Sequence, residues 1–571
     1  MGRRTLESEG RKLNLFKVFI AIIALVIIIS LIYFSIKGII GLFASEDNEI
    51  SKDNVDLISQ NEVIEEKNKT IEEILNEFGG EVKTQIKEDT YFVSKDGVDY
   101  TVYLDGEITE GIIIPWDGKD AKPAIDEAGN INVYSAAELA WIANQVILGE
   151  KNFSGVTITL RKNIDLGARE KEDGSWEGPE WKAIIGFLDE MPNKSNTNTE
   201  SNTETKALDD TTMDVTNENL KRFDGIFNAN GCSIRGMKIE SNKRYQGLFG
   251  YVSGTVSNLT IKHSYINGKD GVGAIAGLSS GRIINCIVED TNIIGEKKIG
   301  GIVGVAMTEA LIENCSTYEN CNVEGNENIG GLIGYTNNNV SIKNSTNGAT
   351  VEGENYVGGI TGISFYGTSI QNCLNYSSQI EGEQYVGGLV GYSAAQIEKS
   401  SNQITTSNTG KVVGKNYVGG IVGLNYEMGD INECFNNGEV IVLEDNCGGI
   451  VGLNGSNVSN CYNKGKIDCT QASGLKIGGV CGQNISESFI NNSYNIGKIN
   501  NTNYAGGLIG ADFGTITNSY CLETSLNKQT TDIEYNKTSE ELKNIILQEL
   551  GESFKVDSEN INSGFPILKW Q

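Results

Sequence analysis

Three glutamates are the first candidates for chemistry in this sequence. Glu324, Glu352 and Glu381 occupy the same place in consecutive repeats, each directly before a glycine, and Glu354 and Glu383 follow two of them at a distance of two residues. If the repeats stack as neighbouring strands, like charges come to lie about 4.8 Å apart, which costs energy unless water or a cation screens them. The pattern predicts a calcium column at Glu324, Glu352 and Glu381 or, alternatively, a solvated row of turn residues.

The chain contains a single histidine, His263, in the stretch Thr260–Ser264. A zinc hydrolase of the H-E-x-x-H type needs two histidines, and a Ser-His-Asp triad needs one beside a nucleophile. We therefore interpret His263 as an ordinary side chain of the repeats and predict no catalytic residue. The alternative is an enzyme that cleaves polysaccharides with carboxylates on an outer face.

The eleven cysteines are better explained by packing than by disulfides or metal. Five share one repeat position, which serine fills in other repeats: Cys286, Cys315, Cys373, Cys434 and Cys461. A position that accepts cysteine or serine requires a small side chain, and an odd total does not suit a disulfide framework. Because the chain has no C-x-x-C pair, we expect no structural zinc site.

A column of tyrosines is the second surface feature. Tyr356, Tyr385 and Tyr417 are equivalent in consecutive repeats, and Tyr504 follows later. Such a column predicts either stacked rings that stabilise the repeats or a flat strip that binds sugars.

A seven-residue phrase positions all these residues. One copy is Tyr385-Val-Gly-Gly-Leu-Val-Gly391, and related copies recur at steps of 27 to 32 residues. The second glycine of the pair, or its equivalent, marks ten repeats: Gly247, Ala274, Gly301, Gly331, Gly359, Gly388, Gly420, Gly449, Gly479 and Gly507. A period of this length indicates a repeat architecture. A phosphate-binding glycine loop would occur once, before a helix, so ten copies exclude that interpretation.

The repeats carry a second phrase, such as Ile312-Glu-Asn-Cys315, and several of them close with a third, such as Val351-Glu-Gly353. Three short strand-like pieces joined by Asn and Gly turns predict one coil of a three-sided parallel β-solenoid, about ten coils long, over residues 223–525. Asparagine tolerates a left-handed bend, and its amide can bond the asparagines of the coils above and below.

The N-terminus predicts a membrane anchor. Residues 18–36 are nineteen uncharged, mostly apolar residues, and five Lys or Arg precede them. The length and charge bias predict a transmembrane helix within 18–43, with the tail 1–17 cytoplasmic and the body outside the cell. A cleaved signal peptide is the alternative, although its apolar core is usually shorter.

The segments between anchor and repeats have distinct patterns. Residues 44–87 predict a partly helical stalk that the pair Gly79-Gly80 ends, and residues 88–134 predict a small β segment with turns at Asp96-Gly97 and Asp105-Gly106.

The two ends of the repeat array are expected to be capped. Residues 135–222 form the N-terminal cap, which opens with a capping box at Ser135–Glu138. Its polar stretch 193–219 predicts a disordered insertion, or alternatively a glycosylated or functional loop. Residues 526–571 form the C-terminal cap, with a helix that begins near Thr538.

The charge distribution limits the partners. The formal net charge is −29, and residues 1–44 hold six Lys or Arg and two Glu, so the remaining 527 residues carry about −33. An acidic body of this kind repels nucleic acid and anionic lipid, so we expect no nucleic-acid partner.

The glycine phrase resembles the GLUG repeat of bacterial surface proteins. The resemblance covers Ile112–Gln571 and includes Trp116-Asp-Gly118, the stretch 223–231 and the ending Gly564–Trp570. It implies a right-handed parallel β-helix on a cell surface. Some members of the family are IgA-specific metallopeptidases that carry such repeats beside a zinc protease domain. This chain lacks the paired histidines of that domain, so protease activity is not implied.

These observations predict an all-β protein, a right-handed parallel β-helix behind a single-pass anchor in the cell membrane. We expect it to serve adhesion, ligand display or envelope organisation, with an extracellular protein or glycan as its partner and without a required cofactor, calcium being the candidate. The alternative is a β-helix polysaccharide lyase or hydrolase.

Overall fold

The computed structural model describes residues 70–87, 89–182, 221–405, 408–426, 428–474, 476–501, 505–526, 533–544 and 546–571. The predicted tail 1–17, the span 18–43, most of the stalk and the insertion 193–219 lie outside these residues. In the described part of the chain, no helix combines the length and apolarity that a bilayer crossing requires. The described residues up to Lys569 form one compact unit.

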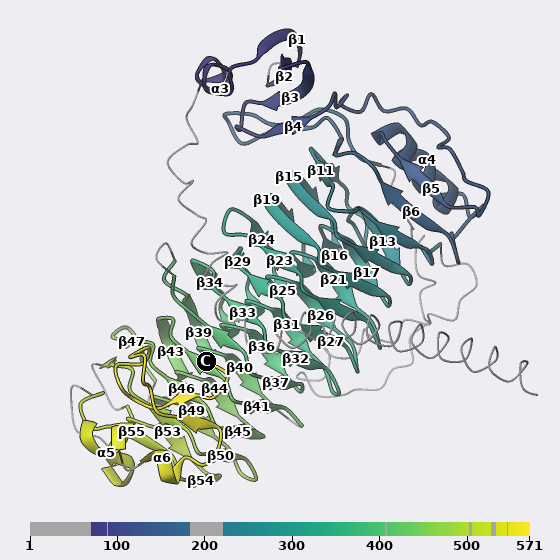
Figure 1. Cartoon of the computed structure of the whole chain (residues 1–571). Helices are drawn as coiled ribbons and strands as arrows, with labels where there is room; N and C mark the ends of the chain where they lie inside the picture. Colours follow the sequence, from purple (N-terminus) through teal and green to yellow (C-terminus); the bar gives the residue numbers. More distant parts are fainter. Residues whose placement is uncertain are drawn as a thin grey trace, which may run out of the picture. The chain divides into compact units, whose positions relative to one another are not determined.

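The repeats fold as a parallel β-solenoid, in which each strand pairs with its equivalents in the neighbouring coils (Figure 1). The first sheet has thirteen parallel strands: β5 (Ile131–Val133), β6 (Thr157–Leu160), β10 (Ile226–Asn228), β14 (Thr255–Ser257), β18 (Arg282–Ile284), β22 (Leu311–Glu313), β27 (Ser341–Lys343), β32 (Ser369–Gln371), β37 (Gln396–Glu398), β41 (Asp430–Asn432), β45 (Asn457–Ser459), β50 (Phe489–Asn491) and β54 (Thr515–Thr517).

The second sheet has ten parallel strands: β13 (Phe249–Val252), β17 (Ala276–Ser279), β21 (Val303–Ala306), β26 (Ile333–Thr336), β31 (Thr361–Ser364), β36 (Val390–Ser393), β40 (Val422–Asn425), β44 (Val451–Asn454), β49 (Cys481–Asn484) and β53 (Ile509–Asp512). Each of these strands begins two residues after one of the ten glycine markers, so the marker identifies this sheet strand by strand.

The third sheet closes the coils with parallel strands on either side of a corner: β7 (Ile164–Asp165), β11 (Ser233–Arg235), β12 (Lys238–Glu240), β15 (Thr260–Asn267), β16 (Asp270–Gly273), β19 (Ile287–Ile294), β20 (Lys297–Gly300), β23 (Ser316–Thr317), β24 (Asn322–Glu324), β25 (Glu327–Gly330), β28 (Thr346–Asn347), β29 (Thr350–Glu352), β30 (Asn355–Gly358), β33 (Leu374–Asn375), β34 (Gln379–Glu381), β35 (Gln384–Gly387), β38 (Ser401–Asn402), β39 (Lys411–Gly419), β42 (Phe435–Asn436), β43 (Val440–Gly448), β46 (Tyr462–Asn463), β47 (Ile467–Cys469), β48 (Ile477–Gly478), β51 (Tyr494–Asn495), β52 (Ile499–Asn501), β55 (Tyr520–Leu522) and β56 (Asn536–Lys537).

The predicted number of about ten coils is too low. The first sheet starts with β5, β6 and β10, which lie ahead of the first glycine phrase and stack on the later strands in the same register. Because these early coils lack that phrase, the marker could not count them. The end of the predicted entry segment, through β5, and the predicted N-terminal cap, through β6, therefore also contribute strands to the solenoid.

The solenoid interior is built from rows of aliphatic side chains. In the first sheet, Ile283, Ile312, Ile342 and Ile370 pair in register from coil to coil, and all are fully buried. Each contributes roughly 1.5–3 kcal/mol by leaving water, but only if the neighbouring coil covers it. The coils therefore depend on one another for stability.

The asparagines of the Ile-x-Asn-Cys phrase form the predicted bend row. Asn285 and Asn314 both have a φ of 53°, in the left-handed region. The amide of Asn285 donates to Asn258 Oδ1 at 3.1 Å, and the amide of Asn314 donates to Asn285 Oδ1 at 3.1 Å. Lys399 and Glu433 interrupt the row and keep a positive φ.

A second asparagine row lies inside the solenoid and was not predicted. It consists of fully buried residues: Asn347, Asn375, Asn402, Asn436, Asn463 and Asn495. Each Nδ2 donates to the Oδ1 of the next residue in the row at 2.8–2.9 Å. The second glycine of each phrase packs against this row, since a Cβ at Gly420 would lie 2.4 Å from Cγ of Asn436.

A small antiparallel sheet precedes the solenoid, and we call residues 81–110 the meander. It comprises β1 (Glu81–Lys87), β2 (Thr90–Lys95), β3 (Val98–Tyr103) and β4 (Ile108–Glu110), in that order. Asp96 and Gly97 both have positive φ in the first predicted hairpin turn. Helix α3 (Ile71–Phe78) ends at Gly79, as expected, and buries Ile74 with Val93 and Val102. Because β1 pairs with β2, residues 81–87 belong to this sheet and not to the stalk.

Short elements complete the two ends. At the N-terminal end are α4 (Ala136–Ile147), with Ser135 as its N-cap, and the hairpin of β8 (Arg169–Glu170) and β9 (Trp176–Glu177). At the C-terminal end are η1 (Ile533–Tyr535), α5 (Ser539–Asn544), α6 (Ile546–Glu549), β57 (Phe554–Lys555) and β58 (Ile567–Leu568). The last two strands pack beside the coils, where Asn562 Nδ2 donates to the Tyr494 hydroxyl at 2.8 Å.

We predict that Asn436→Ala destabilises the solenoid by at least about 3 kcal/mol. The change removes one hydrogen bond from each of the buried amides of Asn402 and Asn463 and takes away the side-chain partner of both the N–H and the C=O of Gly438, each loss costing roughly 1 kcal/mol or more. Asn322→Ala is the matched control, because it removes an exposed Asn–Asn bond of 3.0 Å and should change stability by less than about 0.5 kcal/mol. Urea unfolding followed by circular dichroism measures both, and equal effects would contradict the prediction.

Candidate functional site

The three predicted glutamates do form one row. Glu324 pairs with Glu352, and Glu352 pairs with Glu381, in the register of β24, β29 and β34. Glu324 and Glu352 are exposed and Glu381 is half-buried. Gln379 Nε2 donates to the carboxylate of Glu381, so one end of the row already has a hydrogen-bond donor.

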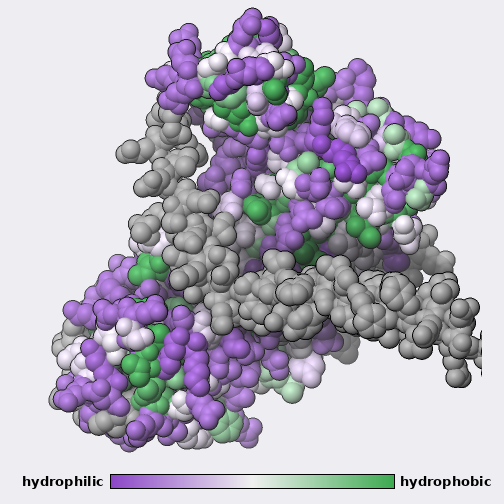
Figure 2. Space-filling view, viewed as in Figure 1, coloured by the Kyte–Doolittle hydropathy of each residue, from purple (hydrophilic) through white to green (hydrophobic). Residues whose placement is uncertain are grey.

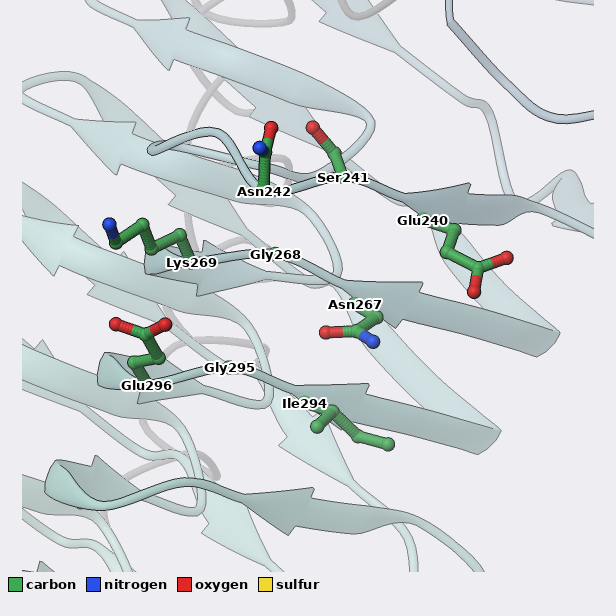
Figure 3. Close-up of a pocket in the computed structure, with 9 residues that line it drawn as sticks. All are labelled: Glu240, Ser241, Asn242, Asn267, Gly268, Lys269, Ile294, Gly295 and Glu296. Atoms are coloured by element: carbon green, nitrogen blue, oxygen red, sulfur yellow. The ribbon is translucent and has the colours of Figure 1, made fainter.

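The same row leads into a groove on the outer side of the first coils. Glu240, Asn267 and Ile294 precede Glu324 in register and line one wall of this groove, whose volume is about 500 Å³. Figure 3 shows Asn242, Lys269 and Glu296 on the opposite wall, one from each of three successive coils, with Gly268 and Gly295 between the walls. The glutamate row and the groove are thus parts of one axial strip.

Two of the three floor positions of the groove are the glycines Gly268 and Gly295, and the third is Ser241. A Cβ at Gly268 would lie 2.7 Å from Val272 Cγ2, and a Cβ at Gly295 would lie 2.5 Å from Ile299 Cδ1. Both positions therefore point toward core side chains and leave the surface hollow. The groove offers two carboxylates, one ammonium group and three amide or hydroxyl side chains, a set that can hydrogen-bond a polar ligand.

Calcium binding by Glu324, Glu352 and Glu381 stays a prediction. Within the described residues, ligand atoms of three or more His, Cys, Asp or Glu come within 4.8 Å of one another in a single group, and that group is Asp105, Glu107 and His263. A cation at the glutamate row would therefore require the side chains to move toward one another.

His263 keeps its place in the stack of coils, but its ring lies in an ionic cluster. Its Nε2 is 3.2 Å from Asp105 Oδ2, and its Nδ1 is 2.5 Å from Asp290 Oδ2. Asp105 belongs to the turn between β3 and β4, whereas Asp290 lies in β19 of the next coil. The histidine therefore connects the meander to two coils of the solenoid.

Arg235 is the centre of this cluster. Its side chain is only 5% exposed, and its guanidinium contacts the Asp105 carboxylate and lies 2.7 Å from Glu107 Oε2. The guanidinium also lies over the Tyr103 ring at 3.7 Å. Lys262 Nζ is 2.7 Å from the other oxygen of Glu107. Both oxygens of Glu107 are thus paired with cations, which makes the group a charge-balanced joint and a poor cation site.

The electrostatics agree with this role. Burial works to raise the pKa of Asp105, but Arg235, His263 and the backbone N–H of Glu107 outweigh it and hold that pKa below its usual range. Burial raises the pKa of the neighbouring Glu289, against the opposing effects of Lys262 and His263. A second group of ion pairs lies beside the cluster. In it, Arg169 contacts Asp165 at 2.7 Å and also contacts Asp89 of the meander.

The tyrosine column is a stack of rings. Tyr356 and Tyr385 lie 4.8 Å apart with 5° between their planes, and Tyr385 and Tyr417 lie 4.9 Å apart with 10° between theirs. All three have positive φ. Because the ring faces cover one another, a sugar could reach mainly their edges, so packing explains this column better than sugar binding. Tyr504 lies outside the described residues.

The cysteines are free, as predicted, and do not form a reactive site. All eleven are unpaired by disulfides, and ten are buried. In the shared row, Cys315 Sγ donates to the carbonyl of Glu313 at 3.4 Å, and Cys461 Sγ donates to that of Ser459 at 3.1 Å. Burial raises the pKa of Cys373 to about 12. Cys373 is therefore protonated at neutral pH, and the row is packed in the interior of the solenoid.

Comparison with known proteins does not assign this chain to a family. No family model matches the sequence, and no curated protein matches it. A crystal structure of a Bacteroides ovatus protein, provisionally described as an immunoglobulin A1 protease, matches with 17% identity and a TM-score of 0.30. The match covers 79% of this chain and 96% of that chain. A similarity of this size does not indicate a shared function.

Sequence reasoning missed the groove and the ionic cluster for different reasons. The groove follows from the aligned glycines Gly268 and Gly295, which the Val/Ile-x-Gly phrase could have indicated. The cluster joins residues more than a hundred positions apart, such as Asp105 and Arg235, and no local pattern relates them.

We predict that Arg235→Met weakens the attachment of the meander by about 2–4 kcal/mol. The cost stays below that of a fully buried pair because Asp105 and Glu107 keep some contact with water. Arg222→Met is the matched control, since the Arg222–Asp224 pair is more exposed and should be worth less than about 1 kcal/mol. Differential scanning calorimetry compares the variants. A loss for Arg235→Met no larger than that of the control would show that the cluster is not a joint.

We also predict that the folded protein is almost inert to thiol reagents. Cys232, the one half-buried cysteine, should react slowly because burial raises its pKa, and the ten buried thiols should react only after unfolding. A colorimetric thiol assay at pH 8 with and without guanidinium chloride measures this difference. Rapid reaction of several thiols in the native protein would contradict the packing described here.

Proposed function

We propose that this chain is a membrane-anchored β-solenoid of the GLUG-repeat type on a bacterial cell surface, where it serves adhesion, ligand display or envelope organisation without catalysis. The observation that supports this proposal is the continuous stack itself. Outward rows such as Asn258–Asn285–Asn314 and Tyr356–Tyr385–Tyr417 are engaged with their own neighbours in the stack. Such rows hold a long rigid body together and leave broad faces for a partner.

The surface chemistry is consistent with an extracellular display role. The described surface in Figure 2 is mostly hydrophilic, and the chain beyond residue 44 carries about −33. An acidic, polar surface keeps such a body soluble and away from anionic lipid headgroups. The apolar run 18–36 would supply the anchor, and the right-handed twist of the coils belongs to the same proposal.

The second candidate is a polysaccharide lyase or hydrolase, favoured by the axial groove. Its walls carry Glu240 and Glu296 with Lys269 between them, which are residue types that such enzymes use. Release of reducing or unsaturated ends from a polysaccharide panel, lost in Glu296→Gln, would establish this alternative. Binding to a glycan or protein array without any cleavage would favour display.

For the proposed calcium column, we predict that calorimetry with Ca²⁺ gives a binding isotherm that Glu352→Gln combined with Glu381→Gln abolishes. Removing two of the three stacked carboxylates takes away most of the oxygen ligands that a calcium ion needs. Glu240→Gln, in the same row but three coils away, is the control and should leave the isotherm unchanged. The absence of heat with the unmutated protein would end the calcium proposal.

The location itself is tested in intact cells. We predict that the full chain, expressed with a C-terminal tag in a bacterium with a single membrane, sediments with the membrane and reacts with an amine reagent that cannot cross it. Deletion of residues 18–43 should remove the chain from the membrane fraction. A full-length chain that stays soluble and unlabelled inside the cell would refute the proposed location.

A further inference from the structure

The groove on the first coils is built in layers that run along the stack. Each of three successive coils supplies one residue to each wall and one to the floor, around a volume of about 500 Å³ (Figure 3). Neighbouring coils lie about 4.8 Å apart, as paired strands do. Three layers at this spacing suit a linear ligand that lies along the stack, with its successive units in equivalent surroundings.

The wall formed by Glu240 and Asn267 is held in place from outside the groove. Trp176, in the hairpin of β8 and β9, stacks on the ring of Tyr265 at 5.9 Å with 26° between the planes. The Tyr265 hydroxyl accepts a hydrogen bond from Asn267 Nδ2 at 3.4 Å, which leaves the amide oxygen for a ligand. Lys238 Nζ donates to the Trp176 carbonyl at 3.0 Å and lies 3.4 Å from Glu240 Oε2. A wall that is fixed in advance lowers the entropic cost of binding.

Main-chain groups of the groove are engaged in bonds between the coils. The N–H of Gly268 donates to the carbonyl of Ile294 at 3.0 Å, and the N–H of Glu296 donates to the carbonyl of Lys269 at 2.7 Å. A peptide that binds as an added strand would need such groups for itself. A ligand in this groove is therefore held by side chains.

The side chains of the lining can both donate and accept hydrogen bonds. Carboxylates accept, an ammonium group donates, and amides and hydroxyls do both, and the lining contains each kind: Glu240, Glu296, Lys269, Asn242, Asn267 and Ser241. Sugar hydroxyls likewise donate and accept, so they can pair with every one of these groups. Ile294 adds an aliphatic surface for the C–H groups of a sugar ring.

The charges at the groove are mixed, and several are paired. Three cations beside it lie in ion pairs with acidic residues, namely Lys238 with Glu240, Arg244 with Asp270 and Lys297 with Glu327. The other charged residues in and next to the groove are Lys243, Lys269, Lys298, Glu296 and Glu324. Positive and negative groups occur in nearly equal numbers, so the site favours neither a polyanion nor a polycation.

We propose that this groove binds a neutral linear glycan, with the sugar chain along the stack and one sugar unit on each of the three coils. The layered shape supplies the direction, the side chains supply the hydrogen bonds, and the mixed charges favour a neutral ligand. A sugar unit in an extended chain advances by about the height of one coil, so each unit meets a new layer. This inference rests on the proposed display function, for which it names the ligand class and the site.

The experiment measures the binding of labelled oligosaccharides to the full chain in detergent by fluorescence polarisation. The neutral probes are cello-, manno- and N-acetylchito-oligosaccharides of one to six units, compared with oligogalacturonate as an acidic probe and with an unstructured neutral peptide. We expect one neutral series to bind, with a Kd that falls by roughly tenfold or more from one to three units and by less than about threefold beyond four.

Variants locate the binding in the groove. Asn267→Ala, Lys269→Ala and Glu296→Ala should each weaken it by roughly threefold to tenfold, the usual effect of one lost hydrogen bond, and the triple variant should abolish it. Lys343→Ala, on the outward side of β27 in the first sheet, is the matched control and should keep the affinity of the unmutated chain. None of the four side chains is buried, so circular dichroism should show an unchanged fold.

The possible outcomes separate this inference from the proposed function. Binding that survives the triple variant, binding that prefers oligogalacturonate or the peptide, and an absence of binding to every neutral series would each overturn the inference, while display of another ligand would stand. Cleavage of a bound neutral glycan would support the ligand class and refute a non-catalytic role. A chain that binds through the groove but stays inside the cell would support the groove and refute the proposed location.

Discussion

The structure depends on one constraint, the parallel in-register stacking of equivalent residues in successive coils. A side chain in this fold meets its own counterparts above and below before it meets anything else. This stacking favours residue types that can hydrogen-bond to, or pack against, an identical residue in the next coil. Isoleucine, asparagine, tyrosine and small residues therefore fill whole rows. It also explains why the core of a coil is completed only by the next coil, so that stability accumulates along the stack.

Glycine takes a specific place in this arrangement. The second glycine of the phrase leaves room for the buried asparagine row, since a Cβ at Gly449 would lie 2.3 Å from Cγ of Asn463. The third glycine lets neighbouring coils approach, since a Cβ at Gly334 would lie 2.3 Å from the carbonyl carbon of Lys298. The glycines of the phrase therefore mark the places where neighbouring coils are in close contact, and their role is structural.

Much of the fold could be predicted from the sequence because these contacts repeat. Ten glycine markers located every strand of the second sheet, and the Ile-x-Asn-Cys phrase located the bend row and the thiol row. The same reasoning undercounted the coils, because β5, β6 and β10 stack without the phrase. The buried row of Asn347 to Asn495 was missed for another reason. A polar residue in an interior is unexpected until the structure shows that its partner is an identical residue one coil away.

The candidate sites lie where equivalent positions in successive coils no longer hold the same residue type. The groove forms where the row of Glu324, Glu352 and Glu381 gives way to Asn267 and Ile294, so that walls of mixed chemistry border the glycine floor. The ionic cluster around Arg235 and His263 forms where the coils contact the meander, which is not a repeat. There, Gly236, His263 and Asp290 occupy successive left-handed positions, and a neutral ladder is replaced by charges that pair with the meander. Residues that match their neighbours build the solenoid, and residues that differ from them are free to contact something else. The most informative positions for function are therefore those at which a row changes its residue type.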